Sequence, residues 1–195
     1  RDLNPIIAML AGEPDFELPV TLRDGEARVD ATVDGPLNAV QIRGKAALTN
    51  VVFQDILFAR AESRFQLGRE ELRLQGLSLA MQKARATGDL RLGLREYVVH
   101  DNSPLSLNAV VTKGELEEIA RLAHLDQPVS GALEGNVVAG GTLGMPTGQI
   151  TFTLDNAAWG TEKFSRMAGQ VSLDALGELR GGLAIEQTRI ELAGS

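Results

Sequence analysis

Hydrophobic and polar residues alternate along most of this chain. From Ala27 to Asp34 the odd positions are apolar and the even positions are polar, and 57–67 repeats the pattern. Strict alternation over six or more residues is typical of a β-strand with one apolar and one polar face. Further strands are predicted within 72–81, 90–94 and 105–111. Such strands belong to antiparallel meanders, because parallel strands are usually apolar on both faces.

Short turn sequences separate the predicted strands. They are rich in Gly, Pro, Asn and Asp, which favour the backbone conformations of tight turns. Connections this short favour hairpins between neighbouring strands. The turn sequences are Arg23-Asp24-Gly25, Asp34-Gly35-Pro36, Gly68-Arg69-Glu70, Gly76, Asn102-Ser103-Pro104, Met145-Pro146-Thr147-Gly148 and Gly181-Gly182.

Two stretches depart from the alternation. Leu116, Ile119 and Leu122 stand at helical spacing, which predicts a short helix near 114–125. The opening stretch has a Pro at the first helical position and a Gly at the end, so a second short helix is predicted near 3–11.

The chain also resembles itself when it is shifted by 106 positions. Residues 25–88 then fall on 131–194 without a gap, so that Asn50 meets Asn156, for example. Each unit consists of a short helix followed by a meander. We therefore predict one β-groove repeat over residues 1–100 and a second over 101–195, which together form one continuous, elongated segment of a longer protein.

The apolar face of this meander needs a covering layer. Two short helices are too small, since ten strands span about 48 Å and a ten-residue helix only about 15 Å. Three arrangements solve the problem: a closed barrel or sandwich, pairing with another chain, or an open trough filled by acyl chains. Small residues on this face, such as Ala59 and Gly135, fill a closed core poorly and favour a trough that leaves room for a guest.

Composition excludes several classes of chemistry. The net charge is −7 and Lys and Arg are not clustered in the sequence, which argues against nucleic-acid binding. The chain has no Cys, and its two histidines, His100 and His124, lack partners at metal-ligand spacing. Gly140–Gly144 lacks the Lys that a phosphate loop requires. We therefore expect no enzyme activity, catalytic residue, metal or cofactor.

Several Gly, Leu and Pro spacings in the second unit match a known family. The stretches are Leu133-Glu134-Gly135, then Gly140 to Gly148, then Leu154 to Ala157, preceded by Pro128 to Ala132. They resemble the repeat signature of the TamB family, the translocation and assembly module proteins. This family is related to the AsmA-like proteins and to bridge-like lipid-transfer proteins.

The resemblance implies a fold and a function. The fold would be mainly β: elongated antiparallel meander repeats, with two short helices, curled into an open hydrophobic groove called a β-taco. The segment would lie in the periplasm of a Gram-negative-type envelope, in a protein anchored in the inner membrane. It would carry phospholipid acyl chains toward the outer membrane and support outer-membrane biogenesis with an outer-membrane β-barrel partner. The alternatives are a scaffold or chaperone module that pairs with nascent outer-membrane strands, and a purely structural β-sandwich.

An open groove would be lined by the apolar set of alternating residues. Near Gly44, Asn50 and Trp159 the sequence does not determine which of the two alternating sets faces the groove, because a bulge there would exchange the two sets. The predicted lipid-binding residues are Val29, Val33, Ile42, Leu57, Phe65, Leu79, Leu92, Leu107, Val137, Ile150, Phe152, Val171 and Leu183.

Overall fold

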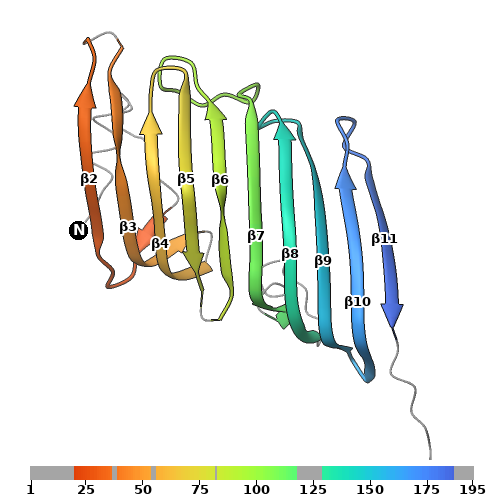
Figure 1. Cartoon of the computed structure of the whole chain (residues 1–195). Coiled ribbons are helices and arrows are strands. Elements are labelled where there is room, and N and C mark those ends of the chain that lie inside the picture. Colours follow the sequence, from red (N-terminus) through yellow and green to blue (C-terminus); the bar gives the residue numbers. More distant parts are fainter. Residues whose placement is uncertain (1–19, 37–38, 54–55, 82, 118–128, 187–195) are drawn as a thin grey trace, which may run out of the picture.

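The chain forms one open antiparallel β-sheet (Figure 1). The computed structural model describes residues 20–186, except 37–38, 54–55, 82 and 118–128. These residues contain eleven strands, which confirms the prediction of a mainly β, open antiparallel fold. The strands are β1 (Val20–Leu22), β2 (Ala27–Asp34), β3 (Gln41–Phe53), β4 (Ile56–Leu67), β5 (Glu71–Ala80), β6 (Arg85–Gly93), β7 (Leu105–Glu115), β8 (Val129–Gly141), β9 (Pro146–Trp159), β10 (Glu162–Leu173) and β11 (Leu179–Glu186).

The topology is a meander in which neighbours in sequence are neighbours in the sheet. From β3 to β11 each strand pairs with the next. At the N-terminal edge β3 takes two partners, because β2 pairs with residues 41–48 and β1 with residues 51–53. β1 and β2 therefore follow one another along the same side of β3.

Three of the predicted turns are wrong. Gly76 lies inside β5, where the register with β4 and β6 shifts. Gly181 and Gly182 lie inside β11 and pair with β10. Of the predicted turn Met145-Pro146-Thr147-Gly148, the last three residues lie in β9, which begins at Pro146. The physical reason is that Gly and Pro mark bulges and edges of strands as well as turns.

Strand positions repeat at the interval found in the sequence. β4 ends at Leu67 and β10 at Leu173, and the pair Thr49–Arg60 corresponds to the pair Asp155–Arg166. The two units differ at the next pairing, where β4 and β5 are joined by a bulged ladder and β10 and β11 by a regular one. The division into repeats at residue 100 stays a prediction.

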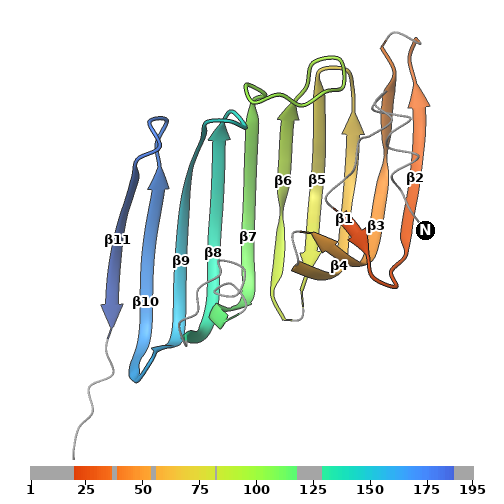
Figure 2. The same cartoon turned by 180° about the vertical axis from the view of Figure 1, so that it is seen from behind.

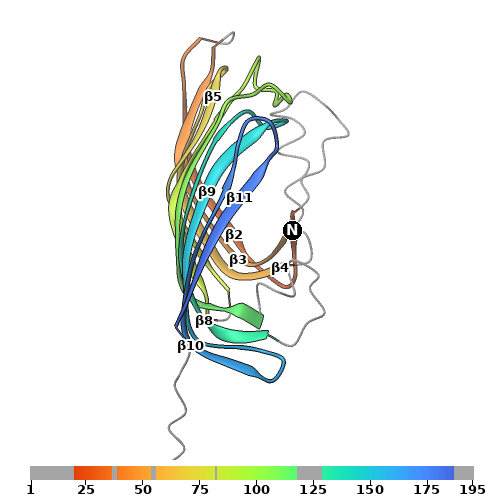
Figure 3. The ribbon, with the colours of Figure 1, turned by 90° about the vertical axis from the view of Figure 1, so that its right-hand side faces the viewer.

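The sheet curves, and one end of its strands turns over (Figure 3). Near this end four residues inside strands have a positive φ: Asn50 (49°), Lys113 (53°), Gly131 (147°) and Asn156 (52°). A left-handed residue interrupts the extended backbone, so the strand changes direction there. We call these four residues the corner. Figure 2 looks onto the concave side, where β1 and the turned-over ends of β3 and β4 lie in front of the sheet.

The corner holds some of the best-buried apolar residues that the structure describes. Val51 follows Asn50 and is 4% exposed, and Ala157 follows Asn156 and is 3% exposed. Leu154, two positions before Asn156, is 6% exposed. Half of the six buried apolar residues among the described ones therefore lie where the strands fold back.

The predicted helices fall largely or wholly outside the described residues. All of 3–11 does, and so does most of 114–125. In the described part of the second stretch, Gly114 and Glu115 still belong to β7, and Leu116 and Glu117 have helical backbone. Both helices stay predictions.

Candidate functional site

The concave face of the sheet is apolar from one edge to the other. Residues directly opposite in paired strands point to the same face, and alternate residues of a strand point to opposite faces. Ile42 is opposite Leu67, which is opposite Leu72, and the row continues through Leu92 to Leu105. Apolar side chains therefore form continuous rows that cross the strands.

A second row extends the apolar face through the C-terminal half. Ala109 of β7 is opposite Val137 of β8, which is opposite Ile150 of β9 and then Val171 of β10. The two rows cover both halves of the sheet, so the apolar face is shared by the two units.

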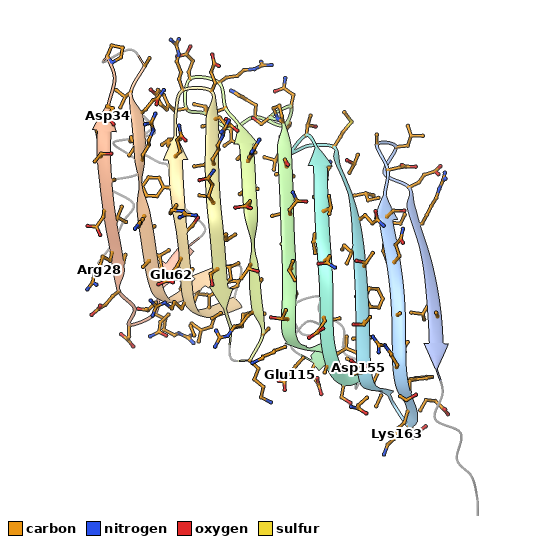
Figure 4. The ribbon with its side chains drawn as sticks, in the orientation of Figure 1. Arg28, Asp34, Glu62, Glu115, Asp155 and Lys163 are labelled. Atoms are coloured by element: carbon orange, nitrogen blue, oxygen red, sulfur yellow. The ribbon has the colours of Figure 1, made fainter. Side chains whose placement is uncertain are left out.

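The convex face is mostly polar. Figure 4 looks onto this side and shows Arg28, Glu62 and Asp155 on it. These residues occupy the positions that alternate with the apolar rows. The sheet thus separates a water-facing convex surface from an apolar concave surface.

Among the described residues, β1 and the turned-over strand ends lie in front of part of the apolar face, and the rest of the face has no second layer (Figure 2 and Figure 3). None of the large side chains of the described residues is fully buried. Side chains in the rows remain accessible, with Val29 52% exposed, Ile150 44% and Leu183 54%. An exposed apolar surface of this continuity is typical of a site that binds an apolar partner.

Twelve of the thirteen predicted lining residues lie on this face. Gly44 does not reverse the pattern, because it pairs with Ala31 and Phe65 of the apolar rows. Leu57 is the exception: it lies beyond the corner, pairs with Val52 and is 42% exposed. Whether these residues bind lipid stays a prediction.

Several other residues complete the apolar face. Within each regular strand, alternation with polar residues identifies the residues of this face. Leu74 and Leu77 are three positions apart and still share the face, because the bulge at Gly76 adds one residue between them. The additional residues are Leu48, Leu67, Leu72, Leu74, Leu77, Leu90, Leu105, Val111, Leu133, Leu154, Met167, Leu173, Leu179 and Ile185.

Small residues on this face do not all leave open space. Phe152 lies over Gly169, the residue opposite it on β10: a Cβ built on Gly169 would be 2.7 Å from the Phe152 Cε1 atom. The aromatic ring therefore fills the position that a side chain on Gly169 would take. Removing the Phe152 ring would leave a depression in the concave surface over Gly169.

The loop between β6 and β7 forms hydrogen bonds to neighbouring connections at the strand ends opposite the corner. Tyr97 donates a hydrogen bond from its hydroxyl to the carbonyl of Val40, at 2.7 Å. On the other side of the loop, the Leu143 N–H donates to the carbonyl of Ser103, at 2.9 Å. One loop therefore links the start of β3 to the turn between β8 and β9.

Among the described residues, several titratable groups form ion pairs on the surface. Arg73 donates a hydrogen bond to Glu71, which lowers the pKa of that carboxyl group. Arg69 likewise lowers the pKa of Glu96. In the part of the chain that the structure describes, no three His, Cys, Asp or Glu residues are grouped so as to hold a metal ion. The same part contains no helix with the length and hydrophobicity to cross a membrane.

No family model matches this chain, and neither a curated protein nor a solved structure matches it. The resemblance to the TamB family therefore stays a prediction that the residue spacings alone support.

Proposed function

We propose that this chain is an internal segment of a bridge-like protein that carries phospholipid by its acyl chains along the concave apolar face. The observation that supports this proposal is a single sheet whose concave face is apolar, continuous and accessible, while its convex face is mostly polar. A soluble sheet of this kind needs something to cover its apolar side. Acyl chains meet that need.

The dimensions of the sheet suit an acyl chain. Ten strands at about 4.8 Å extend for about 48 Å across the sheet, whereas the tails of one bilayer leaflet span about 15 Å. Each buried methylene contributes about 0.8 kcal/mol, so two tails would be held firmly. Because the apolar rows continue from strand to strand, a displaced methylene meets an equivalent contact, and a bound tail can slide.

The resemblance supplies the cellular setting of the proposal. The segment would lie in the periplasm between an inner-membrane anchor and an outer-membrane β-barrel partner, and would serve outer-membrane biogenesis. No step of this transport needs a catalytic residue or a cofactor.

The two free edges of the sheet support one alternative. β2 and β11 each pair on one side among the described strands. An unpaired edge offers N–H and C=O groups to another strand. A scaffold that pairs with nascent outer-membrane strands would use these edges and not the apolar face, whereas a structural β-sandwich would require a second sheet.

The experiment compares matched substitutions on the two faces. We would purify the full chain, analyse its organic extract by mass spectrometry, and measure uptake of a fluorescent phosphatidylcholine. Leu79→Asp and Val137→Asp place a charge on the apolar face. Ser78→Asp and Val138→Asp place the same charge on the neighbouring residue, which faces the convex side.

We expect co-purified phospholipid in the wild-type chain and reduced uptake in the two apolar-face variants alone. Circular dichroism would establish that all four variants keep the β-fold. An extract without phospholipid, together with equal uptake by Val137→Asp and Val138→Asp, would refute the proposal. If instead uptake is absent and a strand peptide protects β11 from hydrogen exchange, the scaffold alternative is favoured.

A further inference from the structure

Tertiary structure gathers cations that are dispersed in the sequence. Arg43 and Lys45 of β3, Arg64 of β4, Arg73 of β5 and Arg91 of β6 all lie on the convex face, and we call them the basic patch. Gln66 is opposite both Arg43 and Arg73, and Arg73 is opposite Arg91, so these residues share one row. Lys45 is opposite Arg64 in the next row. Five cations thus occupy two adjacent rows across four strands.

The arrangement inside the basic patch opposes the stability of the sheet. Lys45 directly faces Arg64, and Arg73 directly faces Arg91. Like charges in directly opposite positions are destabilising. Elsewhere on the same face opposite charges meet, as where Arg166 faces Asp155 with 3.8 Å between Nε and Oδ1. Lys45 also faces Asp30 of β2 on its other side, so the unfavourable contacts lie mainly between Arg73 and Arg91 and at Arg64.

Neighbouring acidic groups compensate part of this charge, because Asp30 of β2 is opposite Lys45 on the same face. Among the described residues, Arg73 is the one member of the basic patch with an ion pair, to Glu71 at 2.7 Å. Asp89 lies beside the patch, and its carboxylate accepts a hydrogen bond from the Gly76 N–H at 2.8 Å. Arg43 donates a hydrogen bond to the Gln41 side chain at 2.6 Å. Arg64 and Arg91 have no ion pair among the described residues and are left to interact with solvent or with a ligand.

An open hollow adjoins the basic patch. It has a volume of about 560 Å³ and spans β4 to β7. Three guanidinium groups of the patch border it, together with neutral hydrogen-bonding side chains and one carboxylate, that of Asp89. The lining includes Arg64, Arg73, Gln75, Arg91, Ser106 and Asn108. Guanidinium groups bind carboxylates through two parallel hydrogen bonds, so the hollow is suited to acidic side chains.

We propose that the basic patch docks a short acidic segment of a partner protein. The charge balance of the chain favours a short segment over an extended polyanion. The net charge is −7, so the chain without these five cations carries −12. Salt screens charges beyond about 8 Å, so the patch attracts anions only locally. A membrane surface or a nucleic acid would extend past the patch and meet the acidic remainder.

The test uses the full chain and a defined probe. The probe is a fluorescein-labelled peptide of five Glu-Thr repeats, and a peptide of five Gln-Thr repeats is its neutral control. Binding is measured by fluorescence anisotropy over a range of salt concentrations. One variant removes three cations of the patch by Arg64→Gln, Arg73→Gln and Arg91→Gln.

A matched variant removes three cations outside the patch, by Arg60→Gln, Arg166→Gln and Arg180→Gln. Flotation with vesicles of phosphatidylcholine containing phosphatidylglycerol forms a second arm. Circular dichroism shows that both triple variants are folded before binding is compared.

We expect the acidic peptide to bind, with an affinity that falls as salt rises. The patch variant should bind about tenfold or more weakly, since each exposed charge contributes up to about 1 kcal/mol, and the matched variant should stay within about twofold of wild type. Equal losses in the two variants would overturn the proposal. So would vesicle binding without peptide binding, or no peptide binding at low salt. Lipid uptake is read separately, so this result does not depend on the proposed transport.

Discussion

Substituting Gly88 with Ala tests whether the sheet needs close approach of its backbones. Gly88 of β6 is opposite Ala109 of β7. A Cβ built on Gly88 would overlap the carbonyl oxygen of Asn108 and lie 2.9 Å from the Cα of Ala109. Both obstacles are backbone atoms. Ordinary carbon contacts are about 3.5–4.0 Å, so β6 and β7 would have to separate by roughly 1 Å.

The magnitude follows from two contributions. Overpacking costs about 1–3 kcal/mol, and each weakened ladder hydrogen bond adds about 1 kcal/mol. With one or two such bonds affected, the free energy of unfolding should fall by about 2–5 kcal/mol. For a chain of this length, about 2–4 °C of melting temperature corresponds to each kcal/mol, so the melting temperature should fall by roughly 4–20 °C.

The assay is thermal and urea denaturation followed by far-ultraviolet circular dichroism. Gly182→Ala in β11 is the control, because a Cβ there has no heavy atom within 4 Å. Ala is favoured over Gly inside a strand by about 0.5–1 kcal/mol, so the control should be neutral or slightly stabilising. Equal melting temperatures for the two variants would refute the reasoning that close backbone approach at Gly88 holds the sheet.

Three further predictions concern the corner, the loop and the effect of pH. Asn50→Val should lower the free energy of unfolding by about 1–3 kcal/mol, because a β-branched residue is strained at positive φ. Asn50→Gly should leave the free energy of unfolding unchanged, and urea denaturation compares the two variants. Tyr97→Phe should cost about 1 kcal/mol by removing the bond to Val40, and an unchanged midpoint would contradict this. The hydrogen bond from Arg73 lowers the pKa of Glu71, so its stabilisation is present above the ordinary pKa and is lost as pH falls through the folded pKa. Glu71→Gln should therefore melt below wild type at about pH 7, and the difference in melting temperature should shrink as the pH is lowered below the ordinary pKa of a Glu carboxyl group.

Much of the apolar face could be predicted from the sequence. Val29 and Val33 alternate with polar neighbours, and the structure places both on the concave face. Phe152 and Val171 follow the same rule. Alternation succeeds because the pleat of an extended backbone turns every second side chain to the same side, which is a local property of each strand.

The sequence pattern failed where the backbone departs from a regular strand. Leu57 keeps the alternation of its neighbours but lies past the corner, because Asn50 on the paired strand adopts a left-handed conformation. Gly76 reads as a turn and is a bulge, and Gly181 and Gly182 read as a turn and lie within β11. A residue type that tolerates several backbone conformations does not specify which one it takes.

What the sequence by itself determined is the identity of the strands, their two faces and the interval of 106 residues at which they recur. Tertiary structure alone decided that the apolar face is concave and that Arg43, Arg73 and Arg91 share one row on the other side. Curvature and neighbours across strands depend on register, which turns, bulges and the corner fix between segments far apart in the chain. Alternation within one strand carries no information about that register.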